Sequence, residues 1–170
     1  MVSYEYSIVD GQLVYSISDY AQVYAAIPAD QPLAFYIVSL FFEAHKFIQR
    51  SNQTPARYDR ATMRSRAPTA AEREEHWQAM TPERRMFLQH AMPSLYAALS
   101  TPTTLRERLS LMLDVVAGCV RVDDCFRVGV ADVYVMRAQL NALPLPDTGS
   151  LPPVLTGRGG FGTAPPPSLI

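Results

Sequence analysis

The residues most suited to bind another molecule lie between positions 51 and 68, a stretch without hydrophobic periodicity that contains two prolines and is expected to form a loop. Four arginines in this loop could contact phosphates and one tyrosine could stack on a base, a combination that proteins use on single-stranded RNA. The candidate nucleic-acid-binding residues are Arg57, Tyr58, Arg60, Arg64 and Arg66. Because Asp59 stands among them and arginine-rich loops are common on solvated surfaces, an ordinary surface loop is the alternative interpretation.

No pattern in the sequence indicates a catalytic residue, a metal site or a cofactor. The motifs of phosphate-binding loops, dinucleotide-binding folds, serine hydrolases and zinc proteases do not occur. His45 is expected at the edge of the core, and His76 is placed to pair with Glu72 on a helix. Cys119 and Cys125 lie six positions apart without a Cys-x-x-Cys pair, which excludes a zinc framework and favours free, buried thiols over a local disulfide.

Composition limits the classes of protein to which the chain can belong. Its 170 residues, 48% of them hydrophobic, suffice for one domain with a core. The net charge of −1 excludes the uniform basic field of a duplex-DNA-binding protein. The longest apolar run, residues 33–42, is half of the roughly 20 residues that a membrane-spanning helix needs. Since the N-terminus also lacks a secretory signal, an intracellular, cytoplasmic protein without a membrane span is expected.

The charges are distributed in two opposite blocks. Residues 1–45 carry five acidic and no basic side chains, a net charge of −5. Residues 46–73 carry seven basic and two acidic side chains, a net charge of +5. Contact between the acidic block of one copy and the basic block of the next would favour self-association, and neutralisation within one chain is the alternative.

Local signals predict a mainly α-helical bundle with an N-terminal β-hairpin. Asp10-Gly11 is typical of a two-residue type I′ turn and predicts a hairpin over residues 1–18. In its register Ile8 faces Leu13, Tyr6 faces Tyr15 and Tyr4 faces Ile17. A short helix is expected to end near Pro28. A second helix, capped by Asp30 and with Pro32 in its first turn, is expected to run through Leu33 to about Arg50 and to form the centre of the core.

Threonines, a proline and a glycine mark the ends of the later helices. The predicted N-caps are Thr69, Thr81 and Thr104. Pro93 is expected to kink or end the helix that Thr81 begins, and Gly118 to cap the end of the helix that Thr104 begins. For residues 119–143 the pattern favours a helix capped by Asp123, and two short strands are the alternative.

The last 28 residues differ from the rest of the chain. Residues 143–170 hold seven of the 14 prolines and five of the eight glycines, which predicts an extended arm outside a single domain of residues 1–142. Apolar residues are spaced along this arm as anchors for docking onto a partner. The candidate docking residues are Leu151, Val154, Leu155, Phe161, Leu169 and Ile170.

Three short segments carry a family resemblance. They are Tyr6-Ser7-Ile8 with Gln12-Leu13-Val14-Tyr15, then Pro102-Thr103-Thr104, then Arg121-Val122-Asp123-Asp124. In this order they resemble segments of tobamovirus rod coat proteins, although they cover under a tenth of the chain and the proline-rich arm replaces that family's C-terminal aromatic motif. The resemblance implies a helical-bundle subunit that polymerises around single-stranded RNA, with Arg121, Asp123 and Asp124 near the strand.

Together these patterns predict a non-enzymatic structural or assembly subunit of a larger complex, such as a viral coat protein in a virion. The C-terminal arm is expected to dock onto another copy of the chain or onto another structural protein. An RNA-binding adaptor that uses the Arg57–Arg66 loop is the second hypothesis, and a small enzyme without a recognisable motif is the third.

Overall fold

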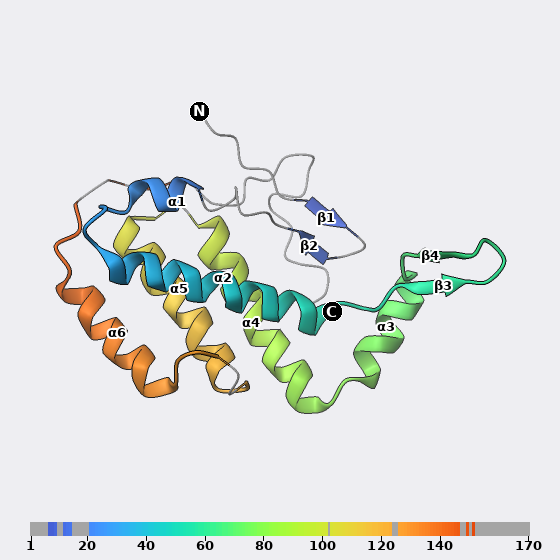
Figure 1. The fold of residues 1–170 in the computed structure, drawn as a ribbon. Helices are drawn as coiled ribbons and strands as arrows, with labels where there is room; N and C mark the ends of the chain where they lie inside the picture. The colour runs from blue at the N-terminus through green and yellow to red at the C-terminus, as the bar shows by residue number, and fades with distance from the viewer. Residues whose placement is uncertain are drawn as a thin grey trace.

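The computed structural model describes residues 7–9, 12–14, 21–101, 103–123, 126–146, 149 and 151. Within these residues the chain forms six helices and two antiparallel β-hairpins, so the predicted mainly α-helical fold is confirmed. The elements, in chain order, are β1 (Ser7–Val9), β2 (Gln12–Val14), α1 (Ala21–Ala26), α2 (Pro32–Asn52), β3 (Arg57–Asp59), β4 (Arg64–Arg66), α3 (Ala70–Ala79), α4 (Pro82–Ser100), α5 (Leu105–Val120) and α6 (Val130–Ala142) (Figure 1).

The hydrophobic core lies among α2, α4, α5 and α6. Helix α5 contacts the other three, and α2 also contacts α4 and α6. The apolar half of α2 buries Ile37, Leu40 and Phe41, because this helix is covered on more than one side. On α5, Leu109 and Leu113 are fully buried. Among the helices of the described residues, none combines the length and the apolar character that a bilayer span requires.

The predicted threonine caps are confirmed at three helix starts. The hydroxyl of each threonine accepts a hydrogen bond from the backbone N–H three residues later, and the residues are Thr69, Thr81 and Thr104. At α5 the Glu107 carboxylate also accepts from the backbone N–H of Thr104, which completes a capping box. The prediction for Asp30 was wrong, because α2 begins one residue later, with Gln31 as N-cap and Pro32 as first helical residue.

Two helices continue past residues at which the sequence allowed an end. Of the two outcomes expected at Pro93, a kink or an end, the end is wrong, and the end expected at Gly118 is wrong as well. Helix α4 continues through Pro93 to Ser100, because Leu88, Met92 and Leu95 bury the same helix face in the core on both sides of the proline. This burial outweighs the cost of about 3 kcal/mol that an interior proline imposes. Helix α5 passes Gly118 and ends at Val120 for the same reason, since Cys119 and Val120 are buried.

The helical alternative for residues 119–143 is confirmed over 130–142, but the helix begins later than expected. Its N-cap is Gly129, whose N–H donates to the Asp132 carboxylate at 2.7 Å, so the prediction of Asp123 as cap was wrong. The backbone N–H of Asp123 instead donates to the carbonyl of Cys119 and closes the turn that follows α5. The face that α6 buries consists of Val133, Met136 and Leu140.

The N-terminal hairpin has the predicted register over its described residues. Strands β1 and β2 pair antiparallel, with Ser7 opposite Val14, Ile8 opposite Leu13 and Val9 opposite Gln12. The pairs expected farther from the turn, Tyr6 with Tyr15 and Tyr4 with Ile17, lie outside the described residues.

The beginning of the predicted arm packs against the body of its own chain. Leu143, Leu145 and Leu151 contact the core, and the Arg106 guanidinium donates to the carbonyl of Leu143 at 2.6 Å. Thr103 and Leu151 exchange two backbone hydrogen bonds. Leu151 is therefore an internal contact and not the free docking residue that the sequence predicted. The other candidate docking residues lie outside the described part of the chain, and they are Val154, Leu155, Phe161, Leu169 and Ile170.

Candidate nucleic-acid interface

The arginine-rich segment forms a β-hairpin that projects from the helical body together with α3 (Figure 1). Strands β3 and β4 pair with Arg57 opposite Arg66, Tyr58 opposite Ser65 and Asp59 opposite Arg64. The prediction of an irregular loop was wrong at these two strands. The sequence contains no hairpin signal here, because the turn lacks an Asn-Gly or Asp-Gly pair.

The side chain of Asp59 holds the turn of this hairpin. Its carboxylate accepts the backbone N–H of Ala61 at 2.9 Å. This hydrogen bond and one from the Thr62 hydroxyl lower the pKa of Asp59 below its ordinary value, because they stabilise the charged carboxylate. Met63 completes the turn with a φ of 57°, a left-handed conformation that is uncommon for residues other than glycine. The turn therefore has a defined shape.

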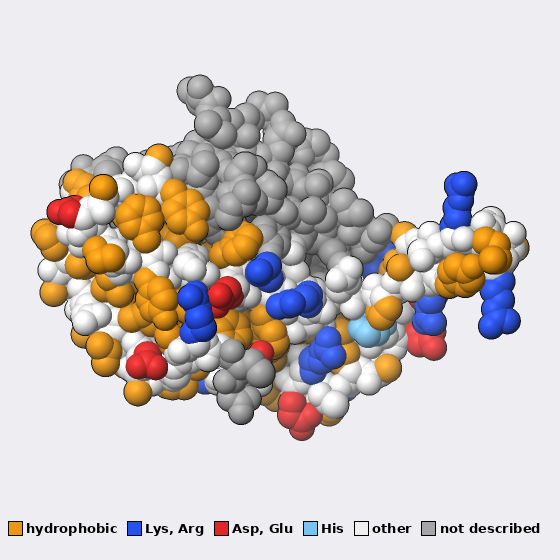
Figure 2. Space-filling view, viewed as in Figure 1, with side chains coloured by type: hydrophobic (Ala, Val, Ile, Leu, Met, Phe, Trp, Pro, Cys, Tyr) orange, Lys and Arg blue, Asp and Glu red, His pale blue; other side chains and the backbone are white. Residues whose placement is uncertain are grey.

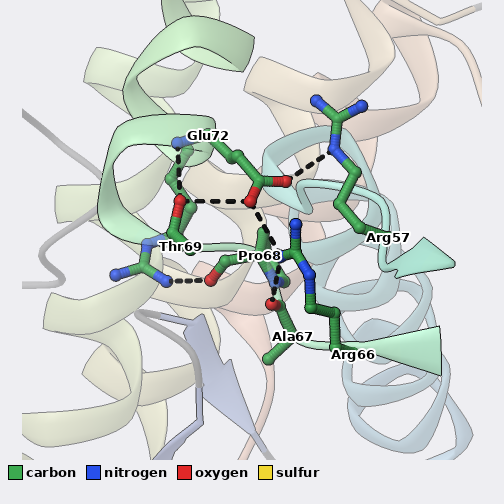
Figure 3. Close-up of polar contacts among 7 residues, drawn as sticks. Arg57, Arg66, Ala67, Pro68, Thr69 and Glu72 are labelled. Atoms are coloured by element: carbon green, nitrogen blue, oxygen red, sulfur yellow. Dashed lines mark hydrogen bonds and ion pairs between the residues drawn. The ribbon is translucent and has the colours of Figure 1, made fainter. Parts of the chain in front are cut away.

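Glu72 of α3 fastens the base of the hairpin to the helix (Figure 3). Its two carboxylate oxygens lie 2.7 Å from Arg57 Nε and 2.7 Å from Arg66 Nη1, and the Thr69 hydroxyl donates to it at 3.1 Å. The hydrogen bond from Arg66 lowers the pKa of Glu72, and the bond from Thr69 acts in the same direction. Glu72 thus pairs with two arginines and not with His76 as predicted. We call this arrangement the Glu72 clamp.

The clamp divides the four arginines of the hairpin into two classes. Arg57 and Arg66 share the single carboxylate of Glu72, which offsets one of their two positive charges. The guanidinium groups of Arg60 and Arg64 are exposed and make no ion pair or hydrogen bond within the described residues. Most other arginines in the described ranges do bind a carbonyl, hydroxyl or carboxylate of the chain, and they are Arg73, Arg84, Arg85, Arg106, Arg108, Arg127 and Arg137. Arg50 and Arg121 also have no side-chain partner among the described residues, so two of the four free guanidinium groups lie on this one hairpin.

An exposed aromatic ring lies on the same hairpin. Tyr58 is 57% exposed, and its hydroxyl donates to the sulfur of Met63 at 3.3 Å. Because side chains alternate along a strand, Tyr58 and Ser65 share the face opposite to Arg57, Arg64 and Arg66. Figure 2 shows basic and hydrophobic side chains side by side at this projecting end of the molecule. The hairpin thus offers two unneutralised cations and a ring that a base could stack on.

The residues implied by the coat-protein resemblance lie elsewhere. Arg121 is the C-cap of α5, and Asp123 lies in the turn after it. Asp124 falls outside the described residues. Figure 1 places the end of α5 away from the β3–β4 hairpin, so the structure does not bring the two predicted sets together.

A small pocket lies between the end of α2 and the base of the hairpin. It has a volume of about 250 Å³ and is lined by Gln53, Thr54, Ala56, Ser65, Arg66, Ala67 and Pro68. The one ionisable group in its lining, Arg66, is already paired with Glu72. The pocket is smaller than the roughly 300–1,000 Å³ of common ligand sites, and its lining contains no acid–base or nucleophilic pair.

The buried titratable groups are structural. His45 is fully buried and not at the edge of the core as predicted, because Phe41 and the surrounding helices cover its ring. Burial lowers the pKa of His45 to about 3, so the imidazole is neutral at physiological pH. Cys119 is a free, buried thiol, as predicted, and burial together with the nearby Asp123 carboxylate raises its pKa to about 12. Cys125 lies outside the described residues, among which no group of three His, Cys, Asp or Glu side chains is arranged to hold a metal.

The role of Glu72 was missed by the sequence analysis. The motif Thr69-Ala-Ala-Glu72 explains this glutamate as a residue of the first helical turn, so no local signal points to a contact with Arg57, 15 positions earlier. Comparison with known protein families, with curated proteins and with solved structures finds no match to this chain. The interpretation of the hairpin therefore depends on its own geometry and charge.

Proposed function

We propose that the protein binds single-stranded RNA through the outer part of the β3–β4 hairpin and has no catalytic activity. The observation that carries this proposal is that one hairpin carries two guanidinium groups without a partner in the described residues, on Arg60 and Arg64, and the exposed ring of Tyr58. The Glu72 clamp and the Asp59 turn hold the hairpin in one shape before any ligand arrives. Preorganisation of this kind lowers the entropy that binding costs.

The geometry favours a single strand over a duplex. A single strand exposes the faces of its bases, so Tyr58 can stack on one of them while the two arginines contact phosphates on either side. A duplex hides these faces and leaves only its phosphates, for which a chain with a net charge of −1 provides no extended basic surface. Stacking on one aromatic ring contributes about 1–3 kcal/mol per base.

The test measures the affinity of the full-length chain for a labelled oligouridine by fluorescence anisotropy at several salt concentrations. Two phosphate contacts to a single strand predict a slope of log K against log salt of about −1.4, which is about a sevenfold loss of affinity for a fourfold rise in salt. The variant Arg60→Ala/Arg64→Ala should remove most of this slope. Tyr58→Ala should weaken binding by at least about fivefold at every salt concentration.

A matched control separates the hairpin from the overall charge. Lys46→Ala/Arg50→Ala removes the same two charges from exposed positions on α2 and should bind as tightly as the unmodified chain. If the control loses as much affinity as the hairpin variant, or if the unmodified chain does not bind, the proposal is wrong. If Arg121→Ala alone abolishes binding, the RNA site lies at the end of α5, as the coat-protein resemblance implies. Parallel titrations with an oligodeoxythymidine and with duplex RNA test the preference for single-stranded RNA.

The structural subunit predicted from the sequence is the second candidate function. The observation that favours it is the outer face of α6, which exposes Tyr134 and Val135 and whose only exposed charged residue is Asp132. A subunit that binds both RNA and other copies of itself would combine the two functions.

A further inference from the structure

The pocket at the base of the β3–β4 hairpin is lined by three polar side chains that are free to bind a ligand. They belong to Gln53, Thr54 and Ser65, and none of these side chains makes a hydrogen bond within the described residues. Thr54 is the most informative of them, because it is only 6% exposed. Its oxygen is not fully enclosed by the protein and can be reached from the pocket. Since buried hydroxyls are nearly always hydrogen-bonded, the free hydroxyl of Thr54 indicates that a molecule in the pocket completes its bonding.

The pocket adjoins the exposed ring of Tyr58. Ser65, which lines the pocket, is the cross-strand partner of Tyr58, so the two side chains share one face of the hairpin. The Cβ atoms of such a pair lie about 5 Å apart. The hydroxyl of Tyr58 contacts Met63 in the turn, whereas the pocket lies toward the base of the hairpin. A strand that crosses this face can therefore meet the ring and the pocket one after the other.

The size and the lining of the pocket suit one nucleobase. A volume of about 250 Å³ corresponds to about eight water molecules at roughly 30 Å³ each, which is enough for one base and too little for two. The Gln53 amide and the two hydroxyls can each donate and accept hydrogen bonds, as the edge of a base requires. The small apolar side chains in the lining leave room for the ring, and they are Ala56, Ala67 and Pro68.

The base of the hairpin also retains positive charge for a phosphate. Arg66 lines the pocket and shares the carboxylate of Glu72 with Arg57. One carboxylate offsets one of the two positive charges, so a net charge of about +1 remains beside the pocket. The neutral polar side chains thus suit the base of a nucleotide, and the residual charge suits its phosphate.

We propose that this pocket holds one unstacked nucleobase of a single-stranded RNA, next to the base that stacks on Tyr58. The proposal rests on the RNA binding proposed above and gives the strand a second point of contact. Proteins recognise single strands in this way, because the bases can be splayed apart and hydrogen-bonded on their edges. A duplex, whose bases are paired and stacked, cannot supply such a base.

The first test variant removes only the buried hydroxyl. Thr54→Val keeps the shape of the side chain and should weaken the binding of the full-length chain to a labelled oligouridine by about two- to tenfold, measured by fluorescence anisotropy. Because this hydroxyl has no hydrogen bond within the described residues, its removal should leave the thermal melt unchanged or raise it. A lower melt would show that the hydroxyl stabilises the fold, which would overturn its role as a ligand contact.

The second variant fills the pocket. Ala67→Leu places a larger side chain in the lining at an exposed position and should weaken binding by at least about fivefold. Ala138→Leu makes the same substitution at an exposed position on α6 and should bind as the unmodified chain does. Both pocket variants remove contacts to a base and no charge, so the slope of log K against log salt should stay that of the unmodified chain.

The outcomes separate this inference from the proposed function. If Thr54→Val and Ala67→Leu bind oligouridine as tightly as the unmodified chain, while Tyr58→Ala and Arg60→Ala/Arg64→Ala weaken binding, the pocket inference is overturned and the RNA-binding proposal stands. A change of the salt slope in Ala67→Leu would show that the leucine disturbs the arginines, and would also count against the pocket.

A titration with uridine monophosphate distinguishes a base of the strand from a free nucleotide. Nuclear magnetic resonance should show a shift of the Gln53 side-chain amide in the unmodified chain that Ala67→Leu abolishes. If uridine monophosphate gives this shift but oligouridine does not bind, the pocket holds a free nucleotide, and the strand is overturned as its source. If neither ligand binds, the inference and the proposed function are both wrong.

Discussion

The fully buried His45 should make the stability of this protein fall between pH 7 and pH 5. Burial holds the pKa of this histidine at about 3, against an ordinary value of 6.5. Between these two pKa values the unfolded chain binds a proton that the folded chain does not bind. Acidification therefore favours the unfolded state, and the free energy of unfolding falls as the pH decreases through 6.5.

The size of this effect follows from the two pKa values. At pH 7 the unfolded histidine is mostly neutral, and at pH 5 it is almost fully protonated, so the free energy of unfolding should fall by about 2 kcal/mol over this interval. The carboxyls whose pKa values are lowered in the folded chain are Asp59, Glu72 and Glu107. The ordinary pKa values, 3.8 for the aspartate and 4.5 for the glutamates, lie below pH 5. The stability that these carboxylates contribute is therefore lost mainly below pH 5.

Urea unfolding at pH 7 and pH 5 measures the loss directly. The unmodified chain and the control His90→Gln, which removes an exposed histidine from α4, should each lose about 2 kcal/mol. His45→Gln removes the buried titrating group, so its stability, although lower at both pH values, should change little between them. If His45→Gln loses as much stability between pH 7 and pH 5 as the unmodified chain, the buried neutral histidine is not the cause.

Two further predictions concern the stability of the helical body. Thr104→Ala removes the hydroxyl that caps α5 and should lower the free energy of unfolding by about 0.5–2 kcal/mol, measured by urea denaturation; an unchanged midpoint would contradict the capping role. A chain that ends after Ala142 should be less stable than one that ends after Leu151 by at least about 2 kcal/mol, because it loses the leucines that contact the core. Equal thermal melts of the two truncated chains would show that residues 143–151 do not stabilise the fold.

Much of the helical framework could be predicted from the sequence because its signals are local. Thr104 and Glu107 lie within one helical turn, so their reciprocal hydrogen bonds depend on few other residues. The register of β1 and β2 was likewise predicted from a local signal, the sequence Asp10-Gly11, which is typical of a two-residue turn. The prediction failed where distant packing outweighed a local preference, as at Pro93, which stays within α4 because the residues around it are buried.

In the candidate RNA site, too, the residue types could be predicted from the sequence and the contacts between distant residues could not. Its residue types, arginines around a tyrosine, are visible in the sequence, but the sequence makes the four arginines equivalent. Only the fold brings Glu72 against Arg57 and Arg66 and leaves Arg60 and Arg64 unneutralised. The exposure of the outer face of α6 could not be predicted from the sequence either, because an amphipathic pattern does not show which apolar residues another element covers.

The sequence by itself determined the helical class, three of the helix starts and the pairing of the described strands at the N-terminus. The physical reason is that each of these depends on residues close together in the chain, as in the hydrogen bonds within one helical turn. The tertiary structure decided which charges stay free, that His45 is buried and that Leu151 packs onto the body. These properties depend on contacts between residues far apart in the chain, and their free energy depends on how the helices exclude water from each side chain.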